Sequence, residues 1–324
     1  MQAKPLISHA SGHVTAPVER SECATDFCAA HDTPDFHTPD WARHAIWYQI
    51  LLDRFRNGNP GNDPKPVRPW TSHWFWLAPW ERRGRGFHAA AFHRHYGGDL
   101  AGLESRLPYL RDLGINALYL NPVFKASTFH KYNATNYLHI DDHFGRLGDY
   151  ESAVVHEDLL DPETWTWTDT DRQFLRFLAA AREMGIRVVI DGVFNHVGTQ
   201  HPAFQDIKAR GRSSPFADWF EVSSWQPFSY KGWWDHPELP VFKKSPTGFA
   251  SEAVKEHIFA VTRRWMAPEG DPSAGVAGWR LDVPNEIAPP FWAQWRELVK
   301  SINPQAYISG EIWGRATQWL DGRH

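Results

Sequence analysis

The sequence predicts a parallel α/β fold, and three observations lead to that prediction. Short apolar strands alternate with amphipathic helical segments along the chain, which is the pattern of repeated β/α units. The strands NALYL and RVVID are almost wholly apolar, as expected for a sheet that is covered on both faces. Polar clusters directly follow three of the strands, at the carboxyl edge of the sheet where active sites commonly lie.

The elements are expected in regular order. Strands are predicted at 46–50, 117–120, 188–190, 276–281 and 307–312. Helices are predicted at 103–114, from Asp169 or Asp171 to Gly185, at 254–265 and at 289–302, because apolar residues recur there at helical spacing. Pro108 lies inside the first of these helices and is expected to kink it.

This alternation divides the chain into four segments. Residues 1–40 are polar and without periodicity, so we interpret them as a disordered leader or as the remnant of a preceding domain. Residues 41–197 are expected to form the first part of the domain of repeated β/α units. Residues 198–250 separate the third strand from its helix and are too long for an ordinary loop, which predicts an inserted domain. Residues 251–324 are expected to continue this domain through a fifth strand.

Composition excludes several classes of partner. A net charge of −4 over 324 residues gives no indication of binding to nucleic acid or to an anionic membrane. The first residues lack the apolar core of a signal peptide, and no apolar run reaches 18 residues, so we expect a cytoplasmic protein. Cys23 and Cys28 are expected to be free thiols rather than metal ligands.

The chain contains 18 Trp residues, which is an unusual number. Each either packs in the core or stacks against the C–H face of a sugar ring. Two groups fall in loop-like sequence and favour a sugar-binding cleft: Trp70, Trp74, Trp76 and Trp80, and then Trp219, Trp225, Trp233 and Trp234.

The polar clusters after the strands contain carboxylates. The third strand ends in Asp191, followed by Asn195 and His196, and the fourth contains Arg280 and Asp282. Because strand side chains alternate between faces, Arg280 and Asp282 point into the same space. Glu311 follows the fifth strand. These groups are either structural ion pairs or a catalytic set, and three clusters on consecutive strands favour catalysis.

Two carboxyl groups on adjacent strands suit the retaining cleavage of a glycosidic bond. Asp282 would be the nucleophile, kept ionised by Arg280. Glu311 would be the general acid/base, with a raised pKa so that it arrives protonated. Asn195 and His196 would donate hydrogen bonds to sugar hydroxyls or orient a carboxylate.

At these residues the sequence resembles the α-amylase family of glycoside hydrolases: DGVFNH at 191–196, GWRLD at 278–282 and GEIW at 310–313 are similar to its first three signatures. The resemblance implies a (β/α)8 barrel of the TIM type, of which about five β/α units are present, with an inserted domain after the third strand. It also implies a fourth signature with a third carboxylate, which has no counterpart here. We therefore expect a fragment that is poorly stable and inactive, or nearly so, when alone.

The first strand and its loop, WYQILLDRFRNGNPGNDP at 47–64, resemble the subgroup of neopullulanases, cyclomaltodextrinases and maltogenic amylases. That resemblance implies a structural Ca²⁺ site; the alternative is an Asn/Gly-rich turn without metal. The implied oxygen ligands are Asn57, Asn59, Asn62, Asp63, the Gly97 carbonyl and Asp99.

The resemblance also implies substrate-binding residues. HKYNATNY at 130–137 would place Tyr132 beneath the cleaved sugar, with His130 nearby, and Asp191 would belong to the same group. Glu286, in DVPNE, would contribute to the leaving-group side, and Trp313 would also bind substrate. ELPVF at 238–242 lacks the Asn that is usual in the subgroup and is followed by Lys243.

The function that follows is hydrolysis of maltooligosaccharides, cyclodextrins or pullulan by double displacement. Two alternatives stay open: an oligo-1,6-glucosidase or transglycosylase of the same family, and a non-catalytic glucan-binding fragment. The expected substrate is an α-glucan oligosaccharide or cyclodextrin, the transglycosylase alternative includes sucrose- or trehalose-acting relatives, and the sequence sets no oligomeric state.

Overall fold

The computed structural model describes residues 38–82 and 86–323. Almost all of the predicted leader, together with Cys23 and Cys28, lies outside the described residues.

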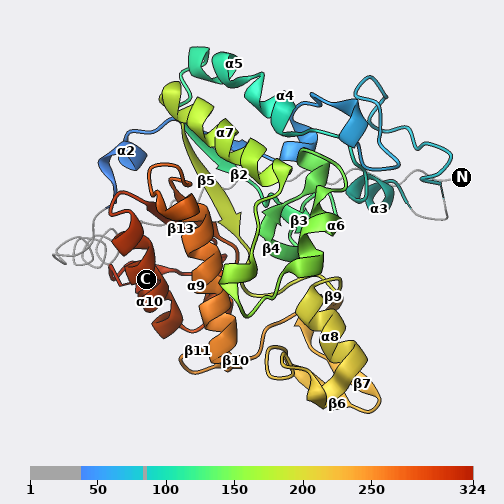
Figure 1. Cartoon of the computed structure of the whole chain (residues 1–324). Coiled ribbons are helices and arrows are strands. Elements are labelled where there is room, and N and C mark those ends of the chain that lie inside the picture. The colour runs from blue at the N-terminus through green and yellow to red at the C-terminus, as the bar shows by residue number, and fades with distance from the viewer. Residues whose placement is uncertain (1–37, 83–85, 324) are drawn as a thin grey trace, which may run out of the picture.

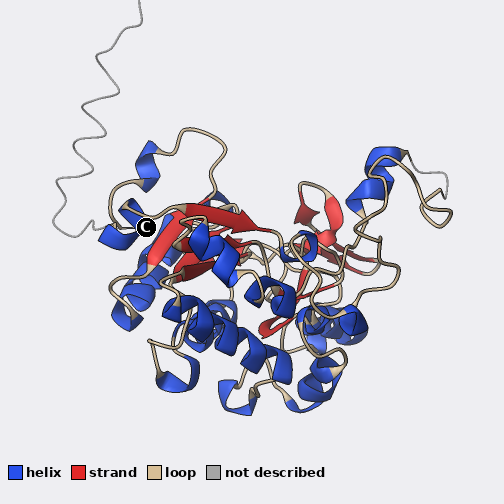
Figure 2. Cartoon of the chain, turned by 90° about the horizontal axis from the view of Figure 1, so that it is seen from above, coloured by secondary structure: helices blue, strands red, loops and turns tan. Residues whose placement is uncertain are grey.

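The centre of the molecule is a five-stranded parallel sheet in the order β1-β2-β5-β12-β13. The strands lie side by side in chain order, which is the order of a barrel and confirms the predicted fold class. Their bounds are Trp47–Ile50, Ala117–Leu120, Arg187–Gly192, Gly278–Leu281 and Tyr307–Gly310. Figure 2 shows most of the helices gathered on one side of these strands.

The two outer strands approach each other at their first residues. The rings of Trp47 in β1 and Tyr307 in β13 lie 5.1 Å apart, and Trp41 contacts both at 5.6 and 6.0 Å. The indole N–H of Trp41 also donates to the carbonyl of Gln305 at 2.9 Å. The sheet is therefore strongly curved, and its concave side contains a cavity of about 340 Å³ that Arg280 lines.

Long helices connect the strands. They are α7 (Asp169–Glu183), α9 (Glu252–Met266) and α10 (Pro289–Ile302), drawn beside the sheet in Figure 1. The predicted single helix over 103–114 is wrong, since the chain forms α4 (Leu100–Glu104) and α5 (Leu107–Asp112). Pro108 explains the break: it has no N–H, and its ring would clash with the carbonyl of Glu104 in a continuous helix.

Shorter elements complete the fold. They are α2 (Asp40–Arg43), η1 (Leu52–Arg54), η2 (Pro60–Asn62), α3 (Phe87–Phe92), β3 (Phe124–Ala126), β4 (Ala134–Ile140), η3 (Asp142–Phe144), α6 (Asp149–Ala153), η4 (Val154–His156), η5 (Pro162–Thr164), η7 (Pro268–Gly270), η8 (Pro284–Glu286) and η9 (Thr317–Trp319). Within the described residues, no helix combines the length and apolar character needed to cross a bilayer.

The segment between β5 and α9 forms one helix and small hairpins, drawn in yellow and gold in Figure 1. Its elements are α8 (Pro202–Arg210), η6 (Gly211–Ser213), β6 (Val222–Trp225), β7 (Phe228–Tyr230), β8 (Gly232–Trp233), β9 (His236–Pro240), β10 (Lys244–Ser245) and β11 (Gly248–Phe249). Trp219 is fully buried there against Phe216 and Phe242, so its predicted place in a sugar-binding cleft is wrong. It packs as a core residue because burial is decided by partners distant in sequence.

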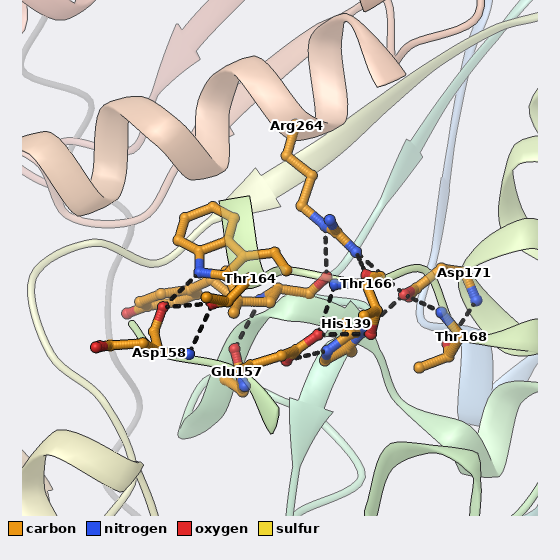
Figure 3. Close-up of polar contacts among 12 residues, drawn as sticks. His139, Glu157, Asp158, Thr164, Thr166, Thr168, Asp171 and Arg264 are labelled. Atoms are coloured by element: carbon orange, nitrogen blue, oxygen red, sulfur yellow. Dashed lines mark hydrogen bonds and ion pairs between the residues drawn. The ribbon is translucent and has the colours of Figure 1, made fainter. Parts of the chain in front are cut away.

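A buried polar network fastens the segment before α7 (Figure 3). His139, in β4, contacts the Asp171 carboxylate at 2.7 Å and the Glu157 carboxylate at 2.8 Å. Asp171 also forms a capping box with Thr168 at the start of α7. Arg264 of α9 donates to the Leu138 carbonyl at 2.9 Å. Four parts of the chain are thus held at one point.

The charge of His139 stabilises this network. Burial alone would lower the pKa of the imidazole, but the hydrogen bonds and charges of Asp171 and Glu157 outweigh it and raise the pKa of His139 to about 9. The imidazolium is therefore the form that the folded chain prefers at neutral pH.

We expect the free energy of unfolding to decrease as the pH rises through 9. The folded-state pKa of His139 lies above the ordinary value near 6.5. Its contribution to the free energy of unfolding is therefore complete below about pH 6.5 and is lost as the pH rises through the folded-state pKa. The loss is on the order of 3 kcal/mol. Urea unfolding at a series of pH values measures it, and a His139→Gln variant should lack this decline; an equal decline in that variant would contradict the assignment.

Candidate active site

One guanidinium connects the polar ends of three neighbouring strands. Arg280, in β12, donates through Nη1 to both oxygens of Asp191 in β5, at 2.8 and 2.9 Å. The same nitrogen contacts Asp282 Oδ1 at 3.1 Å, and Nη2 contacts Glu311 Oε2 at 2.5 Å. The register explains this meeting, because Arg280 pairs with Asp191 on one side and with Ser309 on the other. The predicted catalytic residues thus surround a single positive charge.

Asp191 is the most enclosed of these carboxylates. Besides Arg280, its Oδ2 accepts hydrogen bonds from the hydroxyls of Tyr119 at 2.6 Å and Tyr132 at 2.9 Å. Asn121 donates to the Tyr132 hydroxyl at 2.9 Å and accepts from Gln49 at 3.0 Å. Burial raises the pKa of Asp191 despite the opposing charge of Arg280.

Tyr119, Asn121 and Gln49 were missed from the sequence. The first two lie two residues apart at the end of the apolar run of β2, as Arg280 and Asp282 do at the end of β12. Polar residues at alternate positions of a strand end were the signal that could have identified them.

Several groups besides Arg280 act on the protonation of Asp282. Burial and then the negative charge of Asp191 raise the pKa of Asp282, and Arg280 lowers it by less, since its charge is shared among three carboxylates. Arg280 favours the ionised form, as predicted, while burial and Asp191 act in the opposite direction. Glu311 stands nearer to solvent, with 30% of its side chain exposed against 8% for Asp282.

The residue after Asp282 has a strained backbone. Val283 adopts φ +36° and ψ +54°, a left-handed conformation that β-branched residues rarely occupy. The turn leads at once into η8, which ends with Glu286. Such strain persists where the surroundings fix the chain, and here it sets the direction in which Asp282 and Glu286 leave β12.

The predicted histidines lie beside Tyr132. His196 Nε2 donates to the Tyr132 carbonyl at 3.1 Å, and the Tyr132 N–H donates to His130 Nδ1 at 3.1 Å. Asn195 Nδ2 lies 3.2 Å from His196 Nδ1. Burial lowers the pKa of His196 to about 3 and that of His130 to about 4, so both imidazoles are neutral at pH 7. They position Tyr132 without adding charge to the site.

Glu286 and Trp313 lie at two adjoining cavities. Glu286 lines one cavity of about 260 Å³ together with Asn195 and Lys244, and a second of about 270 Å³ together with Trp313. Burial lowers the pKa of Lys244 to about 7, although Glu286 opposes that change. The sequence did not single out Lys244, which donates to the carbonyls of Asn195 and Phe242, both at 3.0 Å.

The six residues of the implied calcium site divide into two groups. The side-chain oxygens of Asn57 and Asn62 are buried without a hydrogen-bond partner. Asp63 accepts from Asn57 Nδ2 at 2.6 Å, and a Cβ on Gly97 would meet the Asp63 carboxylate at 2.2 Å. Unpartnered amide oxygens beside a carboxylate, crowded against a glycine, fit a hard cation.

The other two residues have backbone partners. Asp99 caps α4 by accepting from the Gly102 N–H at 2.7 Å, and also accepts from Gly58 and Asn59 at 3.0 and 2.8 Å. Asn59 itself accepts from the Gly61 N–H at 3.0 Å. These two side chains shape the loop in the structure as it stands.

Comparison with known families agrees with this geometry. The family model described as "Alpha amylase, catalytic domain" matches residues 49–158 and 166–323. The chain belongs to the alpha-amylase family. The fold of that catalytic domain is the (β/α)8 barrel. The internal gap in the alpha-amylase match, residues 159–165, lies next to Glu157 and Asp158 in the segment drawn in Figure 3.

Several members of the alpha-amylase family are similar over most of this chain. Neopullulanase 2 of Thermoactinomyces vulgaris is 37% identical over 96% of this chain and 46% of its own length. A cyclomaltodextrinase of Geobacillus thermopakistaniensis is 36% identical over 90% of this chain and 42% of its own length. The chain thus spans less than half the length of these curated relatives.

Solved structures of the family lead to the same assignment. The type III pullulan hydrolase from Thermococcus kodakarensis superposes with a TM-score of 0.71 at 30% identity, over 90% of this chain and 47% of that one. The cyclic α-maltosyl-(1→6)-maltose hydrolase from Arthrobacter globiformis, in complex with cyclic α-maltosyl-(1→6)-maltose, gives 0.67 at 32% identity, over 88% and 54%.

We expect Arg280→Met to destabilise the chain by about 3–5 kcal/mol at pH 7, because it leaves buried carboxylates without their shared cation. The penalty should be smaller at pH 5, where protonation removes the unpaired negative charge. Urea unfolding measures both values. Arg172→Met, which breaks the exposed Arg172–Glu269 pair, is the matched control and should change stability by less than about 1 kcal/mol. Equal effects of the two substitutions would contradict a central role for Arg280.

Proposed function

We propose that this chain carries the nucleophile and the general acid/base of a retaining α-glucan hydrolase. The observation that carries the proposal is the contact of one guanidinium, that of Arg280, with both Asp282 and Glu311 from adjacent strands. Retaining cleavage needs two carboxyl groups on a single sugar-sized site, one able to attack and one able to exchange protons. Asp282 is the more enclosed of the two carboxyl groups, and Glu311 lies nearer to solvent.

Each residue has a distinct task in this reaction. Asp282 attacks the anomeric carbon, while Glu311 gives its proton to the leaving glycosidic oxygen; Glu311 then removes a proton from the water that releases the sugar. Arg280 stabilises the ionised form of Asp282 when substrate displaces water from the site. Tyr132, fixed by Asn121 and Asp191, carries the sugar ring on its face.

The proposed substrates are maltooligosaccharides, cyclodextrins or pullulan. Support comes from the relatives, which are a neopullulanase, cyclomaltodextrinases and a maltogenic α-amylase by name. Product analysis on β-cyclodextrin, pullulan, isomaltose and sucrose separates this substrate class from the oligo-1,6-glucosidase and transglycosylase alternatives. Similarity to an intracellular maltogenic amylase of Bacillus subtilis, 32% identical, supports a cytoplasmic location as part of the proposal.

We expect a fluorinated α-glucosyl fluoride to label Asp282 covalently. Fluoride leaves without protonation, and the ring fluorine slows release of the sugar, so the nucleophile alone forms a lasting bond. Intact-mass spectrometry should detect one added sugar on the wild-type chain and on Glu311→Gln, and none on Asp282→Asn. The chain needs no repeated turnover for this experiment.

The control is Asp158→Asn, an exposed carboxylate in the segment before α7, which should label like the wild type. Sugar binding without a covalent adduct would favour the non-catalytic alternative. An adduct on Asp282→Asn would refute the assignment of the nucleophile.

We also propose that the loop of residues 57–63, with Gly97, binds a structural Ca²⁺ ion. Asn57, Asn62, Asp63 and the Gly97 carbonyl would hold it, and the bound ion would neutralise Asp63, whose pKa is raised by burial and by nearby Asp99. Its contribution would be to the rigidity of the loop between β1 and α4.

Calcium at a hundredfold excess over its Kd should raise the melting temperature by about 5 °C relative to the chelated protein, since only the folded state binds it. Differential scanning calorimetry with and without EGTA measures this. Asn57→Ser, which removes an unpartnered oxygen, should abolish the response. Asn59→Ser should retain most of it, because the Asn59 oxygen already has the Gly61 N–H. A wild type that ignores calcium would overturn the proposal.

A further inference from the structure

The side chain of Lys244 joins the inserted segment, residues 198–250, to the chain that leaves β5. Lys244 lies in β10, and its Nζ donates to the carbonyls of Asn195 and Phe242, both at 3.0 Å. The Phe242 N–H donates to the same Asn195 carbonyl at 3.2 Å. One backbone oxygen after β5 therefore accepts two hydrogen bonds from the inserted segment, and one of the two donors is an ionisable group.

The residue that Lys244 holds is connected to Tyr132. Asn195 Nδ2 lies 3.2 Å from His196 Nδ1, and His196 Nε2 donates to the Tyr132 carbonyl at 3.1 Å. His196 also forms a β-bridge with Val241 of the inserted segment. Separation of this segment from Asn195 would therefore disturb the backbone that carries the Tyr132 ring.

The charged form of Lys244 has no counter-charge in contact with it. Among the described residues, no carboxylate forms an ion pair with its Nζ, and both of its hydrogen-bond partners are neutral carbonyls. A neutral amine still has two N–H groups, one for each carbonyl. It therefore makes both hydrogen bonds without the cost of enclosing an unpaired charge.

More distant charges act on Lys244 in both directions. The cavity of about 260 Å³ that Lys244 lines is also lined by four charged residues: Glu221, Lys231, Asp235 and Glu286. Burial has the largest effect and lowers the pKa of Lys244 to about 7. Glu286 and Glu221 oppose this change, and Lys231 adds to it. The nearby His196 is neutral at pH 7 and adds no charge.

We propose that Lys244 is a positioning residue, which fastens the inserted segment to Asn195 and thereby holds Tyr132 in place for the sugar ring. Its part in the reaction rests on the proposed function, whereas the fastening of the segment does not. The neutral amine suits this contact better than the ammonium ion, so the contact should tighten as the pH rises above 7.

The sign follows from the protons that each state binds. When the segment separates, the Lys244 amine meets water and regains its ordinary pKa of 10.5. Between about pH 7 and 10 the separated state therefore binds more protons than the joined state. In the middle of this range the joined state gains about tenfold over the separated state for each pH unit. This dependence has the opposite sign to that of His139, so each is measured with its own variant.

Hydrogen exchange at the Phe242 amide tests the fastening without any sugar. From about pH 7.5 to 8.5 its protection, corrected for the intrinsic exchange rate, should rise about tenfold in the wild type. In Lys244→Met, which has no charge at this position, the protection should not depend on pH. Lys231→Met removes the other lysine of the same cavity and is the matched control, which should keep the wild-type rise.

Covalent labelling of Asp282 by the fluorinated glucosyl fluoride then tests the effect on the site. At equal reagent concentration and pH, Lys244→Met should label about tenfold more slowly than the wild type, because the ring under the sugar is displaced. Lys231→Met should label at the wild-type rate. Lys244→Arg keeps donors for the two carbonyls and should recover part of the rate, but its permanent charge should leave the Phe242 protection independent of pH.

These outcomes decide the inference. An equal rise in protection in Lys244→Met and in the wild type, or no rise in the wild type, would overturn the fastening by Lys244. Labelling of Lys244→Met at the wild-type rate would overturn its positioning role. The failures are separable, because the expected pattern of exchange without any label on the wild type removes only the proposed chemistry.

Discussion

The arrangement of this molecule depends on the guanidinium of Arg280. It is the common partner of Asp191, Asp282 and Glu311, which come from three strands that are distant in sequence. Three carboxylates that converge without a cation would repel one another in a region from which water is largely removed. The positive charge therefore allows the three carboxylates to converge. Both the proposed chemistry and the packing of the strand ends depend on it.

The backbone prepares this meeting before any side chain contributes. Parallel strands in chain order bring their carboxyl ends to one edge, and the register places Arg280 level with Asp191. The left-handed turn at Val283 then redirects the chain, so that Glu286 faces the cavities rather than continuing the strand. A second layer of hydroxyls and amides supports Asp191: Tyr119 donates to it directly, and Gln49 holds Asn121, which donates to Tyr132.

Local signals explain what the sequence predicted well. The apolar runs marked all five strands, and a strand's alternation placed Arg280 beside Asp282, because both properties are decided within a few residues. The predictions that failed concern residues whose surroundings come from distant parts of the chain. Trp219 became a core residue. The protonation of Asp282, on which Arg280 acts as predicted, also depends on Asp191 and on burial, neither of which is visible along β12. The prediction for Pro108 was partly right. The sequence placed the disturbance correctly, but Pro108 divided the helix into two rather than bending it.

The contact between the outer strands has a consequence for how the chain folds. Trp41 and its partner Gln305 are separated by 264 positions, and Trp47 meets Tyr307 only after the fourth crossover is complete. Contacts of such long range are slow to form, because most of the chain must be ordered before they contribute. During synthesis β1 must wait for residue 307 to leave the ribosome, and its aromatic side chains stay available to chaperones until then.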